Sequence, residues 1–235
     1  MICLIDICCE EVCVQLHRTL QTVLWLGFAG CIPAFGQFSA ISTPASAYTG
    51  ATTLIPITAA DGTVLTSLTN GLQTVTLSTS FYARTVPSAY WGTWGSPPNT
   101  ESSTPRVLAN TSPITSVTLA LSLPASIFGF EIEPNLDSGF PINVNYYNGS
   151  TLLGTVSRNV AGNAGALLMA ASSGTPITSV VITLSSGASG FAMAQFRYAT
   201  VSAIPTLSSA ALGALGLLLA GAGVLLARGR RIAGA

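Results

Sequence analysis

Apolar and polar side chains alternate along most of the middle of the chain. From position 72 to 81, for example, Val75, Leu77 and Phe81 fall on one face, with threonine and serine on the other. This period of two is typical of a β-strand with one buried face. The same pattern predicts strands at positions 63–68, 72–81, 114–123, 128–133, 142–147, 151–158, 177–184 and 191–198.

Turn signals separate several of these strands. Asn70-Gly71 lies between the first two, and Asn148-Gly149 lies between 142–147 and 151–158; such pairs form the tight turns of β-hairpins. The pattern of a long amphipathic helix does not occur between positions 38 and 203. Short, regularly spaced, alternating strands predict an all-β domain over 37–203. We expect an antiparallel β-sandwich with jelly-roll-like topology.

The strand at 128–133 leads to a definite expectation about its register. Phe130 and Ile132 share one face, and Glu131 and Glu133 share the other. The segment 37–203 contains no Lys or His that could neutralise buried carboxylates, so the burial of both would be costly. We therefore expect Phe130 and Ile132 in the core and both glutamates in solvent.

The first 36 residues have the layout of a secretory signal. Arg18 precedes an apolar run at 20–32, and small residues at Ala34 and Gly36 suit cleavage after Gly36. Acidic residues before position 12 fit this layout poorly, which a mis-assigned start near position 12 or 14 would explain. Alternatively, residues 28–31 resemble a lipobox, and the protein would then be a lipoprotein processed at Cys31.

A second apolar segment lies near the C-terminus. Residues 207–227 carry no charge and are long enough to cross a bilayer as one helix. Arg228, Arg230 and Arg231 follow directly, and basic residues stay on the cytoplasmic side of a membrane helix. We therefore expect one C-terminal transmembrane helix with its Arg tail inside and the domain outside.

The junction before this segment carries a recognisable motif. Ile204, Pro205, Thr206 and Leu207, followed by the apolar segment and the Arg cluster, resemble the IPTL-CTERM protein-sorting domain, a relative of the PEP-CTERM domain. The resemblance covers positions 204–235. It implies sorting by an exosortase-like membrane protease of a Gram-negative bacterium, with the inner membrane and that protease as partners.

Composition narrows the possible functions. Charged residues make up 7% of the chain and its formal net charge is zero, whereas nucleic-acid binding requires a basic surface. All cysteines and the only histidine, His17, lie before position 32, and the chain has no lysine. A domain that starts at Gln37 would therefore have no disulfide, no Cys/His zinc site and no Ser-His-Asp, Cys-His or Ser-Lys catalytic group. We expect no cofactor.

A pair of carboxylates is the remaining candidate for catalysis. Glu131 and Glu133 share one strand face, about 7 Å apart, which suits the two carboxylates of a glycosidase. Together with Asn135 and Asp137, they could instead supply oxygen ligands to Ca²⁺. A solvated polar face is the simpler interpretation, because alternation already explains both glutamates. We adopt it and expect neither catalytic residues nor a metal site.

Aromatic residues cluster in a Gly- and Pro-rich stretch that runs to position 105. Tyr90, Trp91 and Trp94 could stack on sugar rings if they are exposed. Alternatively, a tryptophan closes one end of the sandwich, because large aromatic side chains are mostly buried. These three residues are the candidate ligand contacts.

These observations together predict an exported protein that is sorted by its C-terminal signal. The C-terminal helix would anchor it in the membrane before processing, and the product would reach the cell surface or the extracellular space. Its domain is expected to be non-enzymatic, with a structural, adhesive or exopolysaccharide-associated role and polysaccharide as a partner. The alternative is a secreted carbohydrate-binding protein or carbohydrate-active enzyme that uses Glu131 or Glu133.

Overall fold

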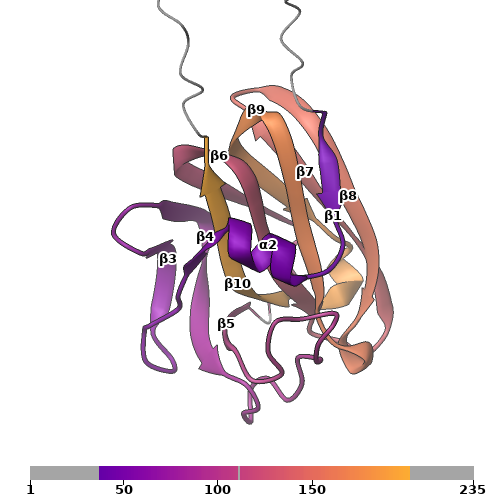
Figure 1. The fold of residues 1–235 in the computed structure, drawn as a ribbon. Coiled ribbons are helices and arrows are strands. Elements are labelled where there is room, and N and C mark those ends of the chain that lie inside the picture. Colours follow the sequence, from indigo (N-terminus) through magenta and orange to yellow (C-terminus); the bar gives the residue numbers. More distant parts are fainter. Residues whose placement is uncertain (1–36, 111, 202–235) are drawn as a thin grey trace, which may run out of the picture.

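In the computed structural model, residues 37–110 and 112–201 are described, and antiparallel strands account for most of them (Figure 1). The strands are β1 (Ser39–Ile41), β2 (Thr53–Ile55), β3 (Val64–Thr69), β4 (Thr74–Thr85), β5 (Arg106–Asn110), β6 (Ser116–Pro134), β7 (Gly139–Asn148), β8 (Thr151–Ala161), β9 (Leu167–Thr183) and β10 (Phe191–Thr200). One short α-helix, α2 (Ser46–Ala51), and two 3₁₀ turns, η1 (Gly162–Ala164) and η2 (Ser186–Ala188), complete the elements.

The predicted signal segment (1–36) and the predicted sorting segment (204–235) lie outside the described residues. Within the described part of the chain, no helix combines the length and apolar character needed to cross a bilayer. The expectations of a signal helix, a sorting motif, a transmembrane helix and an Arg tail therefore stay predictions.

Every strand that the alternation predicts is present in the structure, which confirms an all-β domain of antiparallel strands. The expected strands at 114–123 and 128–133 are the two parts of one long strand, β6. Three strands are not predicted, namely β1, β2 and β5, and β9 begins at Leu167 rather than at 177. The first residues of β9 are buried at almost every position, so they do not alternate.

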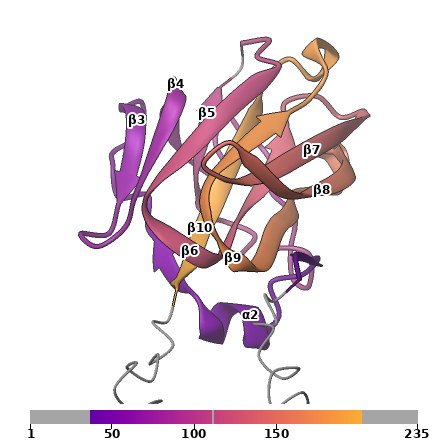
Figure 2. The same cartoon turned by 90° about the horizontal axis from the view of Figure 1, so that it is seen from above.

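Long strands that change partner organise the sheet. The strand order is β2-β10-β5-β4-β6-β9-β7-β8, with β1 beside β9 and β3 beside β4. The first part of β6 pairs with β4 and its last part pairs with β10, and β9 pairs with both parts. Register shifts on either side of Ala125 mark where β6 changes partner. Figure 2 shows β3, β4 and β5 on one side and β7 and β8 on the other, with β6, β9 and β10 between them.

The curved sheet encloses one main apolar core, as in a β-sandwich. Side chains from β2 to β10 belong to a single buried cluster. Phe130 is completely buried in it, 5.7 Å from the ring centroid of Phe196. Ile132 is also completely buried. The expected inward orientation of Phe130 and Ile132 is confirmed.

Both Asn-Gly pairs form hairpin turns, as the sequence predicts. Gly71 and Gly149 have positive φ angles of 90° and 57°, which glycine adopts without a steric cost. The Asn70 side-chain oxygen accepts hydrogen bonds from the backbone N–H groups of Leu72 and Gln73, which stabilises the first turn. The β7–β8 hairpin closes between Asn148 and Thr151.

The last part of β6 is buried on both faces, and the candidate site lies there. Every residue from Phe128 to Pro134 is buried, including the two glutamates expected to face solvent. Over Gly129, a Cβ atom would lie 2.7 Å from the Tyr48 hydroxyl and 2.3 Å from the Ala170 Cβ, so only glycine lets α2 approach this face of the sheet. The covering of the next residues on the same face comes from a loop.

Candidate functional site

The loop between β4 and β5, residues 86–105, covers the face of β6 that carries Glu131 and Glu133. We call this loop the strap. Its Trp91 and Trp94 belong to a second, smaller apolar cluster with residues of β5 and β10. In β10, Ala192 and Ala194 belong to this second cluster, whereas Met193 between them belongs to the main core. The sheet therefore has a core on each face at this end.

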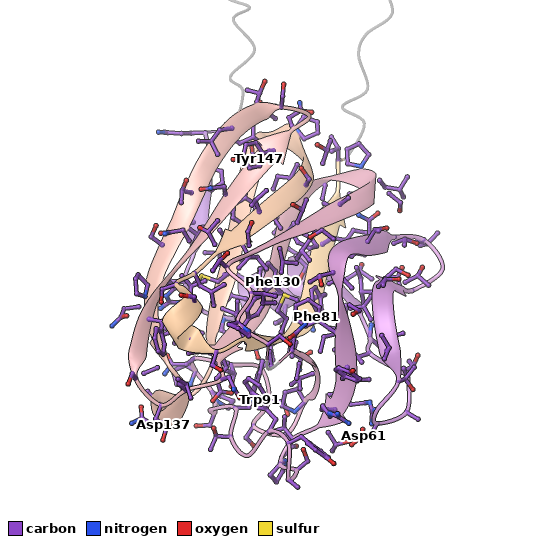
Figure 3. The ribbon with its side chains drawn as sticks, turned by 180° about the vertical axis from the view of Figure 1, so that it is seen from behind. Asp61, Phe81, Trp91, Phe130, Asp137 and Tyr147 are labelled. Atoms are coloured by element: carbon purple, nitrogen blue, oxygen red, sulfur yellow. The ribbon has the colours of Figure 1, made fainter. Side chains whose placement is uncertain are left out.

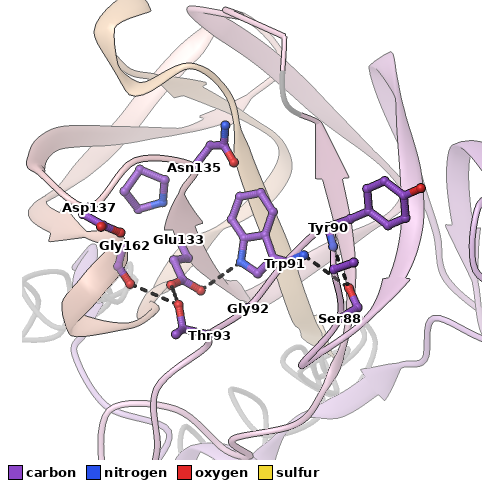
Figure 4. A pocket seen from close by; sticks show the side chains of 11 residues that line it. Ser88, Tyr90, Trp91, Gly92, Thr93, Glu133, Asn135, Asp137 and Gly162 are labelled. Atoms are coloured by element: carbon purple, nitrogen blue, oxygen red, sulfur yellow. Dashed lines mark hydrogen bonds between the residues drawn. The ribbon is translucent and has the colours of Figure 1, made fainter.

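Both glutamates accept hydrogen bonds from the strap. The indole N–H of Trp94 donates to Glu131 Oε2 at 2.7 Å. The indole N–H of Trp91 donates to Glu133 Oε2 at 3.0 Å (Figure 4). The Thr93 hydroxyl lies 2.9 Å from Glu133 Oε1. Buried indole N–H groups need an acceptor, and the two carboxylates supply one each.

A fourth hydrogen bond joins Glu131 to the far end of the strap. The backbone N–H of Glu101 donates to Glu131 Oε1 at 2.6 Å. The Glu101 carboxylate in turn forms an ion pair with Arg197 of β10 at 2.7 Å, and both side chains are largely buried. The strap is therefore bonded to the sheet at several points along its length.

The expectation that Glu131 and Glu133 face solvent is wrong. Their exposed fractions are 0% and 1%. The period of two correctly separates them from Phe130 and Ile132, but it does not reveal that a loop from a distant part of the chain covers the second face. Hydrogen bonds from Trp91, Trp94 and the Glu101 backbone offset the cost of desolvation.

Burial raises the pKa of Glu131 and that of Glu133 to about 7, because removal from water disfavours the carboxylate form. The hydrogen bonds from the two indoles act in the opposite direction, since they stabilise the charged form. In Glu133 the neighbouring Asp137 charge also raises the pKa. Near neutral pH, both groups can therefore exchange a proton.

A polar pocket of about 310 Å³ opens beside Trp91, between the strap and the turn after β6 (Figure 4). The strap contributes residues 88–93 to its lining, and the opposite side consists of residues 133–135, Asp137 and Gly162. Figure 3 shows Trp91 and Asp137 near the same end of the molecule, away from Tyr147. The buried Glu133 carboxyl forms part of the pocket lining, whereas Asp137 is exposed.

The three candidate aromatic contacts differ in position. Trp94 is 1% exposed and Trp91 is 5% exposed, so both mainly close the end of the sheet; the ring of Trp94 has no free face for a sugar. Tyr90 is 67% exposed and lines the pocket. The Arg84 guanidinium lies over one face of the Tyr90 ring, 4.3 Å from its centroid. Among the three, Tyr90 has the accessible ring.

The four oxygen-bearing residues considered for Ca²⁺ do not converge on one point. Glu131 is bonded to Trp94 and the Glu101 backbone, whereas Glu133, Asn135 and Asp137 line the pocket. Within residues 37–110 and 112–201, no group of three or more His, Cys, Asp or Glu side chains is arranged to hold a metal ion.

Two further residues of the site, Ser88 and Thr93, are not singled out by the sequence. Ser88 Oγ accepts hydrogen bonds from the backbone N–H groups of Tyr90 and Trp91, with N–O distances of 3.3 and 3.2 Å. These bonds shape the pocket wall. Thr93 lies between the two tryptophans in sequence and contacts both Glu133 and the Gly162 carbonyl. One feature of the sequence could have indicated this arrangement. Buried Trp N–H groups require hydrogen-bond acceptors, and the domain has few carboxylates to supply them.

No family model and no curated protein matches the chain. Among solved structures, the module CsCBM6-3 of Clostridium stercorarium, solved with cellobiose, aligns at 14% identity and a TM-score of 0.27, covering 48% of this chain and 85% of the module. A family 29 carbohydrate-binding module from Piromyces equi aligns at 11% identity and a TM-score of 0.29, covering 56% of this chain and 94% of that one. The enzymatically active domain of tailspike protein 4 from bacteriophage CBA120 aligns at 14% identity and a TM-score of 0.29, covering 56% of this chain and 20% of the tailspike chain.

Proposed function

We propose that this protein is exported, sorted by its C-terminal segment, and active in the envelope or extracellular space through binding and not through catalysis. The role would be structural, adhesive or associated with exopolysaccharide. The single observation that carries the non-catalytic part is the use of the Glu131 and Glu133 oxygens. Each oxygen already accepts a hydrogen bond that attaches the strap to the sheet.

The jelly-roll-like winding of the sandwich belongs to the same proposal. Strands far apart in the sequence lie side by side, as β10 does with β2, β5 and β6. Such long-range pairing is what a jelly roll requires, and the number of strands is sufficient for one.

Export and sorting rest on the two terminal segments, and mass spectrometry of the protein from its native envelope tests them. We expect an N-terminus near Gln37 and loss of the C-terminal Arg tail after processing. Neutral replacements at Arg228, Arg230 and Arg231 should disturb anchoring or processing, because these charges hold the C-terminus in the cytoplasm. A mature protein that retains His17, or a tail variant with unchanged surface yield, would contradict the proposal.

A carbohydrate-active enzyme is the second candidate, and one observation favours it. Glu133 lines the pocket with a pKa raised to about 7, as a general acid needs, and Asp137 offers a second carboxylate there. The test is the release of reducing ends from polysaccharides by the wild type and by Glu133→Gln. We expect no release from either protein. Release by the wild type that Glu133→Gln abolishes would establish the enzyme instead.

A further inference from the structure

The charged side chains that line the pocket are both acidic. Glu133 and Asp137 line it, and none of the described residues that line it is an arginine. The Arg84 guanidinium lies over the Tyr90 ring but is not part of the pocket lining. Two carboxyl groups without a basic partner would repel an anionic ligand and accept hydrogen bonds from hydroxyl groups.

The polar groups of the lining offer both donors and acceptors. Ser88 Oγ accepts two backbone N–H groups, which leaves its own hydrogen to donate. The Asn135 amide nitrogen donates to the Ser189 carbonyl at 3.0 Å, which orients the amide and leaves its oxygen as an acceptor. A ligand with several hydroxyl groups matches this set, because each hydroxyl both donates and accepts.

An aromatic face lies at the edge of the same pocket. The Tyr90 ring is mostly exposed, and Arg84 holds it from one side by a contact at 4.3 Å. The same guanidinium lies 5.2 Å from the centroid of the Tyr82 ring, so Arg84 is itself held between two rings. A ring held in this way loses little freedom when a ligand stacks on its other face.

From these three features we infer that the pocket binds an uncharged sugar unit of a polysaccharide, with its ring on Tyr90 and its hydroxyl groups on Ser88, Asn135 and Asp137. The inference rests on the proposed function and names its ligand class. It excludes glycans rich in uronic acid or sulfate, whose negative charges would lie beside Glu133 and Asp137.

Affinity electrophoresis of the full chain in mild detergent tests this, with dextran, a soluble β-glucan and galactomannan as neutral probes and alginate as the acidic probe. We expect retardation by at least one neutral polymer and none by alginate. Tyr90→Ala and Asp137→Ala should each weaken binding about three- to tenfold, the loss expected for one aromatic or polar contact. Leu72→Ala removes a similarly exposed side chain outside the pocket and should bind as the wild type does.

Each other result overturns the inference. The absence of binding to all three neutral polymers does so, as does preferential binding of alginate. Equal binding by Tyr90→Ala, Asp137→Ala and the wild type would place the glycan elsewhere. Binding that EDTA abolishes and Ca²⁺ restores would assign the pocket to a metal ion. Export and sorting are measured separately in the native envelope, so a protein that is correctly sorted but binds no glycan refutes only the ligand inference.

Discussion

Glu131 and Glu133 occupy equivalent positions on one strand face, but their partners differ in kind. Both oxygens of Glu131 accept from N–H groups, those of Trp94 and the Glu101 backbone, which can only donate. Glu133 has one such donor, the Trp91 indole, and its other oxygen contacts the Thr93 hydroxyl. A hydroxyl can accept as well as donate, so the two sites tolerate an amide differently.

Glu131→Gln should therefore destabilise the protein by about 1–3 kcal/mol, because the new NH₂ group faces an N–H donor in either orientation. Glu133→Gln should be nearly neutral: its amide can donate to Thr93 Oγ, and Thr93 can donate to the Gly162 carbonyl, which lies 3.3 Å away. Urea denaturation followed by tryptophan fluorescence measures both. Equal costs for the two substitutions would show that the donor pattern is wrong.

Phe130 tests the main core at the same strand. Its side chain is fully buried between the rings of Phe128 and Phe196. Phe130→Ala should cost about 3–5 kcal/mol, the usual range when a buried phenylalanine leaves a cavity. Leu152→Ala is the matched control, since Leu152 is 53% exposed and its loss should change stability by less than about 0.5 kcal/mol. A mild Phe130→Ala would place that residue outside the core.

At the scale of elements, the strap depends on a close backbone crossing. The Trp94 carbonyl accepts a hydrogen bond from the Ala166 N–H group. Beside it, Gly95 and Gly165 have positive φ angles of 104° and 89°. A Cβ on Gly165 would lie 2.6 Å from the Gly95 Cα, so the two backbones can approach only without side chains there.

Gly165→Ala should therefore loosen the strap, through both the contact with Gly95 and the unfavourable φ angle. Gly92→Ala, in the same loop, is the control because a Cβ there meets nothing within 4 Å. Limited proteolysis should cut the strap faster in Gly165→Ala, while Gly92→Ala should match the wild type. Equal cleavage of all three proteins would contradict the crossing as the point of attachment.

The sequence predicts elements well where one face is buried and poorly where both are. In 142–147 and 151–158, alternation and the Asn148-Gly149 turn are sufficient to identify the β7–β8 hairpin. The start of β9 is apolar and small on both faces, so alternation is lost there. The strap is missed for a related reason: its contact with β6 joins positions about forty residues apart, and no local pattern encodes such a contact.

At the scale of the whole molecule, the pocket lies at the opposite end from the start of β1 and the end of β10. Figure 1 shows the start of β1 and the end of β10 near one end, and the loop before β5 near the other. If the C-terminal segment anchors the protein in a membrane, this arrangement would direct Tyr90 and the pocket away from the bilayer. Such an orientation suits the binding of a polymer outside the cell.

The two buried glutamates also determine how the stability of the whole domain depends on pH. Each has a pKa raised from 4.5 in the unfolded chain to about 7 in the fold, so the folded state binds protons more tightly. Their contribution to stability is complete below pH 4.5 and is lost as the pH rises to about 7. The lowered pKa of Asp61 acts in the opposite sense, but below about pH 4, outside this window.

We therefore expect the free energy of unfolding to fall between pH 5 and pH 7 and to level off above it. Urea denaturation at half-unit intervals of pH measures the slope, with ionic strength held constant. Glu133→Gln keeps the buried contacts but removes one titrating group, so it should retain a shallower slope due to Glu131 alone. Stability that instead stays level from pH 5 to pH 7 would mean that the hydrogen bonds from Trp91, Trp94 and the Glu101 backbone outweigh desolvation, and that both carboxylates are charged in the fold throughout this range.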